Sequence, residues 1–200
     1  MTGRRIGWKS SRGLLIVISG PGGVGKDTLI QMLRARNPHL CYSVSYTTRP
    51  VRPNEVPGQH YTFVDVPTFQ QLAASGELLE HAVVNGHLYG TSARRVAEVQ
   101  ETGCDVILKI DVQGAEQVRR KRPDGVYVFI APPNMEELLR RRVVRGAESA
   151  EEMQARQELS EVEMSYAASY DHIVVNDDAE RAVSEIEDTL EQERRKRHAA

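Results

Sequence analysis

Short apolar runs alternate along this chain with segments in which apolar residues recur every three or four positions. Runs rich in β-branched residues predict buried strands at 14–18, 105–111, 125–131 and 172–176. Helical spacing predicts helices at 26–36, 92–101, 113–121, 151–169 and 179–197, and another after Asn134. This alternation is typical of an α/β domain.

One stretch departs from that alternation. After a predicted strand at 41–46, this stretch is predicted to hold strands at 60–65, 78–84 and 87–91, a helix at 68–75 and a hairpin turn at Asn85-Gly86. A long loop with three prolines, 47–58, lies among them. We therefore expect residues 49–91 to form a small β-rich insertion, distinct from the βα pattern around it.

The first predicted strand leads into a glycine-rich turn and then a helix, which is the setting of a phosphate-binding loop. Gly20, Gly25 and Lys26 fit the pattern G-x-x-x-x-G-K-[ST], but Asp27 stands where a hydroxyl residue usually helps to hold Mg²⁺. Thr28 could replace that hydroxyl, or Asp27 could order a water of the metal. An ordinary exposed turn is the alternative. The residues predicted here to bind the phosphates of a nucleotide triphosphate are Gly20, Pro21, Gly22, Gly23, Val24, Gly25, Lys26, Asp27 and Thr28.

Other charged residues allow two interpretations each. Arg49 and Arg52, in the proline-rich loop, could grip a phosphate from two sides or belong to a solvated basic loop. Asp111 ends a buried strand, where it could lie near a metal or cap the next helix.

A run of arginines follows Asn134. Arg141 and Arg145 are four residues apart and share a helix face, and Arg156 lies on the next predicted helix. They could close over a transferring phosphate or form a solvated face.

Composition and charge bear on the partners and the cellular compartment that we expect for this chain. The chain has 200 residues and a formal net charge of −2, so no global field favours nucleic acid or a membrane surface. Cys41 and Cys104, far apart in sequence, suggest a reducing compartment rather than a disulfide framework. Its apolar runs are much shorter than the roughly 20 residues of a membrane helix. Residues 1–12 are expected to form a flexible tail.

The order and spacing of several stretches together are similar to the guanylate kinase family of P-loop nucleoside monophosphate kinases. These stretches are 43–49, Arg52-x-x-Glu55, Gly58-x-x-Tyr61-x-Phe63, 88–91, 110–114, 129–133 and 174–177. The resemblance implies a three-layer α/β fold with a five-stranded parallel sheet. It assigns residues 13–48 and 92–200 to the P-loop core, 49–91 to a GMP-binding insertion and about 134–160 to a helical lid.

The same resemblance implies roles for individual residues. Ser45, Glu80 and Thr91 match the residues that read guanine; a carboxylate accepts the two neighbouring N–H donors of that base, which adenine lacks. Arg49, Arg52 and Tyr61 match the grip on the GMP phosphate, assisted by Tyr89. Asn176 matches a residue beside the ATP base. The implied catalytic residues are Lys26, Arg49, Arg141, Arg145 and Arg156, with Mg²⁺ near Thr28 and Asp111.

Two positions depart from the family pattern. Asp27 replaces the usual serine, and Lys109 occupies a position that is usually acidic. Lys109 points to the same side of its strand as Asp111. It could strengthen phosphate binding, or pair with Asp111 and disturb the metal.

The resulting hypothesis is a cytoplasmic enzyme of purine nucleotide metabolism and GMP recycling. It would move a phosphoryl group reversibly from ATP to GMP or dGMP with Mg²⁺, with no nucleic-acid or membrane partner. The oligomeric state stays open. A kinase of the same fold with another substrate, and a non-catalytic guanylate-kinase-like binding module, are the alternatives.

Overall fold

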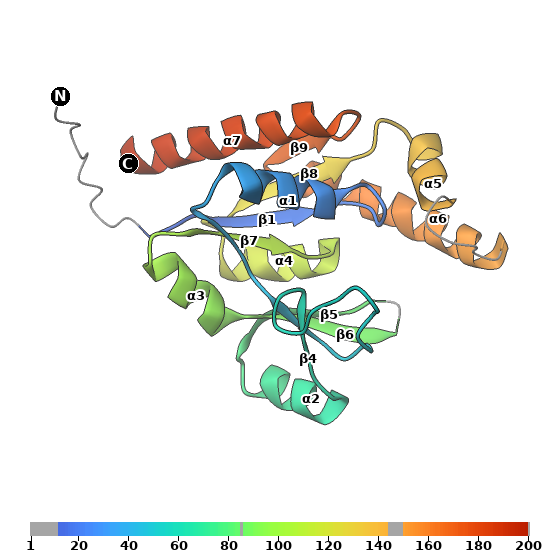
Figure 1. The fold of residues 1–200 in the computed structure, drawn as a ribbon, viewed down its shortest axis with the longest axis horizontal. Coiled ribbons are helices and arrows are strands. Elements are labelled where there is room, and N and C mark those ends of the chain that lie inside the picture. Colours follow the sequence, from blue (N-terminus) through green and yellow to red (C-terminus); the bar gives the residue numbers. More distant parts are fainter. Residues whose placement is uncertain (1–11, 85, 144–149, 200) are drawn as a thin grey trace.

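The strands of this protein form two separate sheets (Figure 1), as seen in a computed structural model that describes residues 12–84, 86–143 and 150–199. The larger sheet has five strands and the order β2-β7-β1-β8-β9, and each neighbouring pair is parallel. The strands are β1 (Leu15–Ser19), β2 (Leu40–Tyr42), β7 (Asp105–Lys109), β8 (Val126–Ala131) and β9 (His172–Val175). The predicted five-stranded parallel sheet is therefore confirmed.

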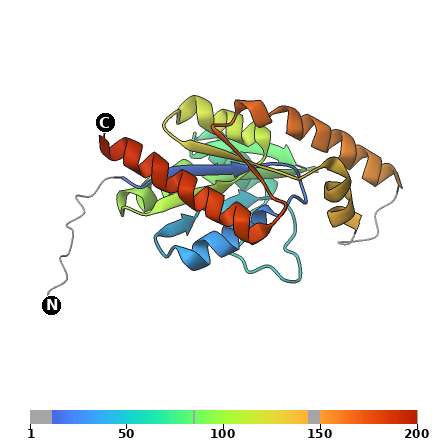
Figure 2. The same cartoon turned by 90° about the horizontal axis from the view of Figure 1, so that it is seen from above.

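Helices cover both faces of this sheet, which makes the three layers (Figures 1 and 2). Ile16 and Ile18 of β1 pack with α1 (Lys26–Arg36) and α7 (Ala179–Ala199) on one face. Leu15 and Val17 pack with α3 (Ala93–Glu101) and α4 (Val112–Lys121) on the other. Because both faces of β1 are buried, its sequence is apolar throughout instead of alternating.

The smaller sheet has the order β4-β3-β6-β5 and lies beside α4 (Figure 1). Its strands are β3 (Ser45–Thr47), β4 (Tyr61–Phe63), β5 (Leu78–Val84) and β6 (His87–Ser92), and α2 (Val66–Ala74) packs on it through Phe69. The antiparallel pair of β5 and β6 is the predicted hairpin. Asn85 of its turn lies outside the described residues.

The single strand predicted at 41–46 is wrong. The chain leaves the larger sheet after β2 and enters the smaller sheet at β3, and the Ser43 amide still donates to the Ile107 carbonyl oxygen at 3.0 Å. The sequence stays strand-like across this break. Because β-propensity does not specify which sheet a strand joins, the pattern alone predicted a single strand.

The remaining helices are α5 (Met135–Val143) and α6 (Ala150–Ser165), followed by a short 3-10 helix, η1 (Ala167–Ser169). They lie near the end of the larger sheet toward which β1 points (Figures 1 and 2). The helix predicted at 151–169 is thus α6 plus η1. Part of the expected lid, 144–149, and nearly all of the expected tail lie outside the described residues. None of the helices within the described ranges is long and apolar enough to cross a membrane.

Candidate active site

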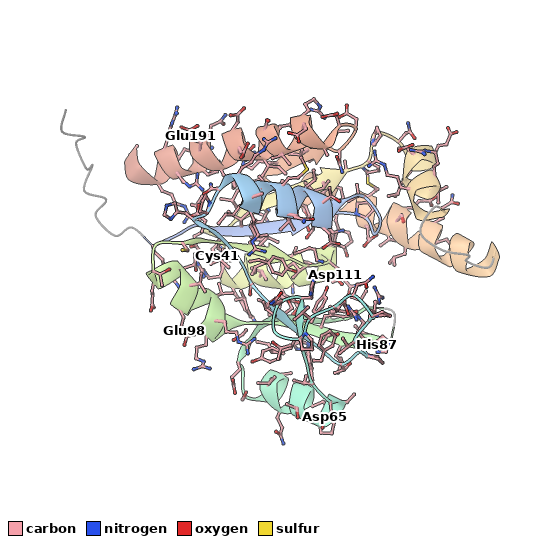
Figure 3. The ribbon with its side chains drawn as sticks, in the orientation of Figure 1. Cys41, Asp65, His87, Glu98, Asp111 and Glu191 are labelled. Atoms are coloured by element: carbon pink, nitrogen blue, oxygen red, sulfur yellow. The ribbon has the colours of Figure 1, made fainter. Side chains whose placement is uncertain are left out.

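A cavity of about 340 Å³ lies between the carboxyl ends of the parallel strands and the smaller sheet. It brings together predicted site residues from three parts of the chain. The phosphate-binding loop contributes Gly20, Gly22 and Lys26. The smaller sheet and its loop contribute Ser45, Arg52, Tyr61, Glu80 and Tyr89, and the segment after β7 contributes Asp111. Asp111 lies between the two sheets (Figure 3).

The backbone of the phosphate-binding loop requires glycine. Gly20, Gly23 and Gly25 have φ values of 143°, 86° and 102°, which side chains disfavour. A Cβ atom on Gly20 would also lie 2.2 Å from the Ile130 carbonyl oxygen. The loop therefore folds tightly over the end of β8 and leads directly into α1.

This loop already shows its capacity to bind negative charge. The Gly22 amide donates to Oε2 of Glu163, on α6, at 3.2 Å. Lys26 Nζ donates to the carbonyl oxygens of Gly20 and Pro21, at 2.5 and 3.0 Å. An amide that binds a carboxylate oxygen in this position could bind a phosphate oxygen in the same way.

Glu80 forms the buried floor of the cavity. Its side chain accepts a hydrogen bond from the Thr91 hydroxyl at 2.6 Å, and Thr91 Oγ1 lies 3.4 Å from Ser45 Oγ. A Cβ atom on Gly114 would lie 2.7 Å from Glu80 Oε2, so glycine there makes room for the carboxylate. Burial raises the pKa of Glu80 to about 7, partly opposed by the Thr91 hydrogen bond. Glu80 is thus poised between its charged and neutral forms near neutral pH.

Arg49 is held by a bidentate ion pair with Glu55. Its Nη1 donates to Glu55 Oε2 at 2.6 Å, Nη2 donates to Oε1, and Nε donates to the Tyr89 hydroxyl at 3.1 Å. The hydrogen bonds from Arg49 hold the pKa of Glu55 down, at about 2. Arg49 therefore reaches the cavity mainly through Tyr89, which lines it, whereas Arg52 lines it directly.

Lys109 pairs with Asp27 and not with Asp111. Lys109 Nζ donates to Asp27 Oδ1 at 2.5 Å, and it lies 5.9 Å from the centre of the Tyr61 ring. Burial alone would lower the pKa of Lys109, but Tyr42, Tyr61 and Asp27 together raise it above its ordinary value. Lys109 is therefore a protonated cation on the wall of the cavity.

The two interpretations of Asp111 are not exclusive. Asp111 caps α4, since its Oδ1 accepts from the Gly114 amide at 2.7 Å. The capping interpretation is confirmed, and the residue still lines the cavity. Burial raises the pKa of this carboxyl.

The described residues hold no group of three His, Cys, Asp or Glu side chains that could bind a metal. Thr28 and Asp111, the predicted Mg²⁺ ligands, line different cavities. Mg²⁺ at nucleotide sites is held by one or two protein groups together with phosphates and waters. Isolated oxygen ligands of this kind fit a metal that enters with a nucleotide.

A second cavity, of about 450 Å³, lies on the other side of the phosphate-binding loop and is lined by Gly23, Gly25, Thr28, Arg140, Arg141 and residues 176–179. Asn176 is buried there, and its Nδ2 donates to the Val24 carbonyl oxygen at 2.7 Å. Arg141 donates to the Asn176 carbonyl oxygen at 3.0 Å and to Glu137 at 2.8 Å. The second cavity is thus lined by α5, the phosphate-binding loop and the start of α7.

The structure does not bring all the predicted arginines together. Arg141 lines the second cavity rather than the first. Arg145 lies outside the described residues, and only the backbone of Arg156, on α6, is described.

Two residues of the site were missed in the sequence. Glu55 holds Arg49, and Glu163 binds the phosphate-binding loop. Glu55 lies in one of the stretches that resemble the guanylate kinase family, Arg52-x-x-Glu55, but no role was predicted for it. Glu163 carried no signal, because it lies 141 residues from its partner.

Comparison with known proteins identifies a family for this chain. The family model for guanylate kinase matches residues 12–193. A guanylate kinase of Carboxydothermus hydrogenoformans is 43% identical over 92% of this chain and 91% of its own length. One of Thermus thermophilus is 46% identical over 94% and 84%. The crystal structure of guanylate kinase from Anaplasma phagocytophilum, 34% identical, superposes with a TM-score of 0.74 over 92% of this chain and 87% of that one.

We expect Glu55→Gln to lower the free energy of unfolding by about 2–4 kcal/mol, because it leaves the buried guanidinium of Arg49 without its charged partner. Urea unfolding at pH 7 measures this. Glu98→Gln, in an exposed pair on α3 with Arg94, is the control and should change the free energy by less than about 0.5 kcal/mol. Equal effects of the two substitutions would contradict a structural role for the Arg49–Glu55 pair.

The low pKa of Glu55 also gives this contribution a pH dependence. Because folding lowers that pKa from 4.5 to about 2, the contribution is present above about pH 4.5 and is lost as the pH falls through about 2.

Proposed function

This chain belongs to the guanylate kinase family, and from that premise we propose that it reversibly transfers the γ-phosphoryl group of ATP to GMP or dGMP, releasing ADP. One observation carries the proposal. A single cavity is lined both by a phosphate-binding loop and by a buried carboxylate with two hydroxyl neighbours. The first suits a polyphosphate, and the second suits a base that presents two adjacent donors.

Glu80, Thr91 and Ser45 would select guanine. An ionised Glu80 accepts from the N1–H and 2-amino groups, and a hydroxyl can donate to O6. Adenine offers no such pair of donors, so its binding would leave a buried acceptor unsatisfied, at a cost of about 1–3 kcal/mol. Rejection of adenine would therefore follow from that penalty as much as from attraction to guanine.

Arg52, Tyr61 and Tyr89 would hold the acceptor phosphate. They line the same cavity as Glu80 and belong to the loop and strands of the smaller sheet. Arg49 would support them, since it donates to the Tyr89 hydroxyl and lies 5.0 Å from the centre of the Tyr61 ring. We accordingly propose that residues 49–91 act as the GMP-binding insertion.

The phosphate-binding loop would hold the donor. Its backbone amides and the start of α1 would attract the phosphates of ATP. Lys26, at the end of the same loop, would bind them as well. Glu163 would have to release the Gly22 amide first, because the Glu163 carboxylate and a phosphate oxygen would accept from the same N–H. Asn176 and the second cavity are the candidates for the adenosine side. Mg²⁺ would enter as part of MgATP, with Thr28 and Asp111 as its candidate protein ligands, and would supply positive charge that offsets the charge of the phosphates.

Transfer needs little covalent chemistry from the protein. The acceptor phosphate is largely ionised at pH 7, so it can attack without a general base. Lys26 and the arginines, with Arg141, Arg145 and Arg156 as candidates on the lid at 134–160, would stabilise the spreading negative charge. Exclusion of water would limit hydrolysis of ATP.

One feature supports a cytoplasmic location, and another bears on the class of ligand. Cys41 and Cys104 are both free thiols, as expected in a reducing compartment. A net charge of −2 favours small-molecule ligands over nucleic acid or an anionic membrane.

Replacing Lys26 tests the loop assignment. Lys26→Met should lower kcat for GMP by about 100- to 1,000-fold, because a charge that stabilises the transition state is lost. Coupled measurement of ADP release gives kcat, and thermal unfolding checks the fold. Lys196→Met, on the exposed end of α7, is the matched control. A Lys26→Met rate within threefold of the wild-type rate would contradict the assignment.

The pH dependence of guanosine binding tests Glu80. Guanosine carries no phosphate, so its affinity reports the base site alone. With a pKa of about 7, the ionised fraction of Glu80 rises about tenfold between pH 6 and pH 8, and guanosine affinity should rise accordingly. In Glu80→Gln the affinity should be weaker and flat over this range. A wild-type affinity independent of pH, or an unchanged slope in Glu80→Gln, would remove Glu80 from the base site.

Glu80 should also make the folding stability depend on pH, with a trend opposite to that of guanosine affinity. Because folding raises its pKa from 4.5 to about 7, its contribution is fully present below about pH 4.5 and is lost as the pH rises through 7. Nucleotide binding and stability are therefore expected to have opposite pH trends around this residue.

A further inference from the structure

We propose, on the basis of the function above, that Lys109 binds the phosphate of the acceptor nucleotide and that Asp27 is the counter-ion that holds it there. Neither residue fits the usual pattern of the loop and strand in which it lies. The structure joins these two departures in one ion pair, Lys109 Nζ to Asp27 Oδ1 at 2.5 Å.

The backbone directs Lys109 to the right place. It is the last residue of β7 and is aligned with Ile18 of β1, just before the phosphate-binding loop. Its side chain lines the first cavity together with Lys26, Arg52 and Tyr61. Ligands of open α/β sheets bind at these carboxyl ends.

Lys109 faces the acceptor side of the cavity. Its ammonium lies 5.9 Å from the centre of the Tyr61 ring, and Arg49 lies 5.0 Å from the same ring. Two cations therefore surround a tyrosine that belongs to the smaller sheet. A phosphate bound beside Tyr61 and Arg52 would meet Lys109 as an additional positive charge.

The pair with Asp27 leaves Lys109 able to bind. An ammonium has three donors, and Asp27 and the neighbouring Tyr42 use at most two of them. The Lys109 side chain is 18% exposed, but that of Asp27 is 78% exposed. The carboxylate partner is therefore mostly in water, and the buried ammonium keeps a donor for a ligand that enters the cavity.

Asp27 explains why the cation is needed. It lies in the first turn of α1, directly after Lys26, where a lone carboxylate would repel the phosphates. Lys109 compensates that charge and adds a donor for the acceptor phosphate. The two residues should therefore be energetically coupled.

Calorimetric titration with GMP and with guanosine, without metal or ATP, tests the binding role. Lys109→Met should weaken GMP binding about 10- to 100-fold, the effect of one charge-assisted hydrogen bond, and change guanosine binding less than twofold. Lys196→Met is the matched control and should change neither. GMP affinity within twofold of wild type in Lys109→Met would overturn the proposal, as would equal losses for GMP and guanosine.

The double variant tests the pairing. Adding Asp27→Asn to Lys109→Met should restore GMP affinity at least threefold, because the uncompensated carboxylate is removed. No restoration would overturn the role of Asp27 as the counter-ion. Failure of the proposed function would look different: the wild-type protein would then neither bind GMP nor transfer phosphate to it.

Discussion

The parallel pairing of β1 with β7 is the constraint on which the rest of this site depends. It places Ile18 beside Lys109, so the chain leaves both strands at the same edge of the sheet. The phosphate-binding loop, Lys109 and Asp111 consequently line one cavity. Ser19 strengthens this junction, since its hydroxyl donates to the Ile110 carbonyl oxygen at 2.9 Å. Both strands are buried on both faces, and this makes the edge rigid enough to hold charged groups near one another.

The smaller sheet forms the opposite wall of the cavity. The chemistry of this wall depends on the burial of Glu80. Glu80 lies where an ionised carboxylate is costly, and only Thr91 donates to it within the described side chains. Guanine would supply the donors that Glu80 lacks. A phosphate would similarly complete the cationic side around Arg52, Tyr61 and Lys109. The protein thus holds groups that are only partly satisfied by one another, and a nucleotide monophosphate of the right base would satisfy them together.

Sequence reasoning predicted the parts that follow local rules. The strand, glycine turn and helix around Lys26 are signalled within about twenty residues, and family resemblance grouped Ser45, Glu80 and Thr91, which the structure brings together. Other features depend on contacts across the fold. The chain changes sheets between Tyr42 and Ser45 without any change in its strand-like pattern. Asp27 and Lys109 are 82 residues apart, so their pairing has no local signal. Arg49 was expected in the phosphate grip, but its bidentate pair with Glu55 depends on how a proline-rich loop folds back.

The most direct test of the account is the rate of ADP formation from MgATP with GMP, dGMP, AMP, UMP, CMP and TMP in turn. The account predicts rapid turnover with GMP and dGMP alone, because only guanine matches the buried carboxylate and its hydroxyl neighbours. Such a result would also show that Asp27 and Lys109 are compatible with catalysis. Comparable rates with AMP, or no turnover although GMP binds, would contradict the claim that this cavity is a guanine-specific phosphoryl-transfer site.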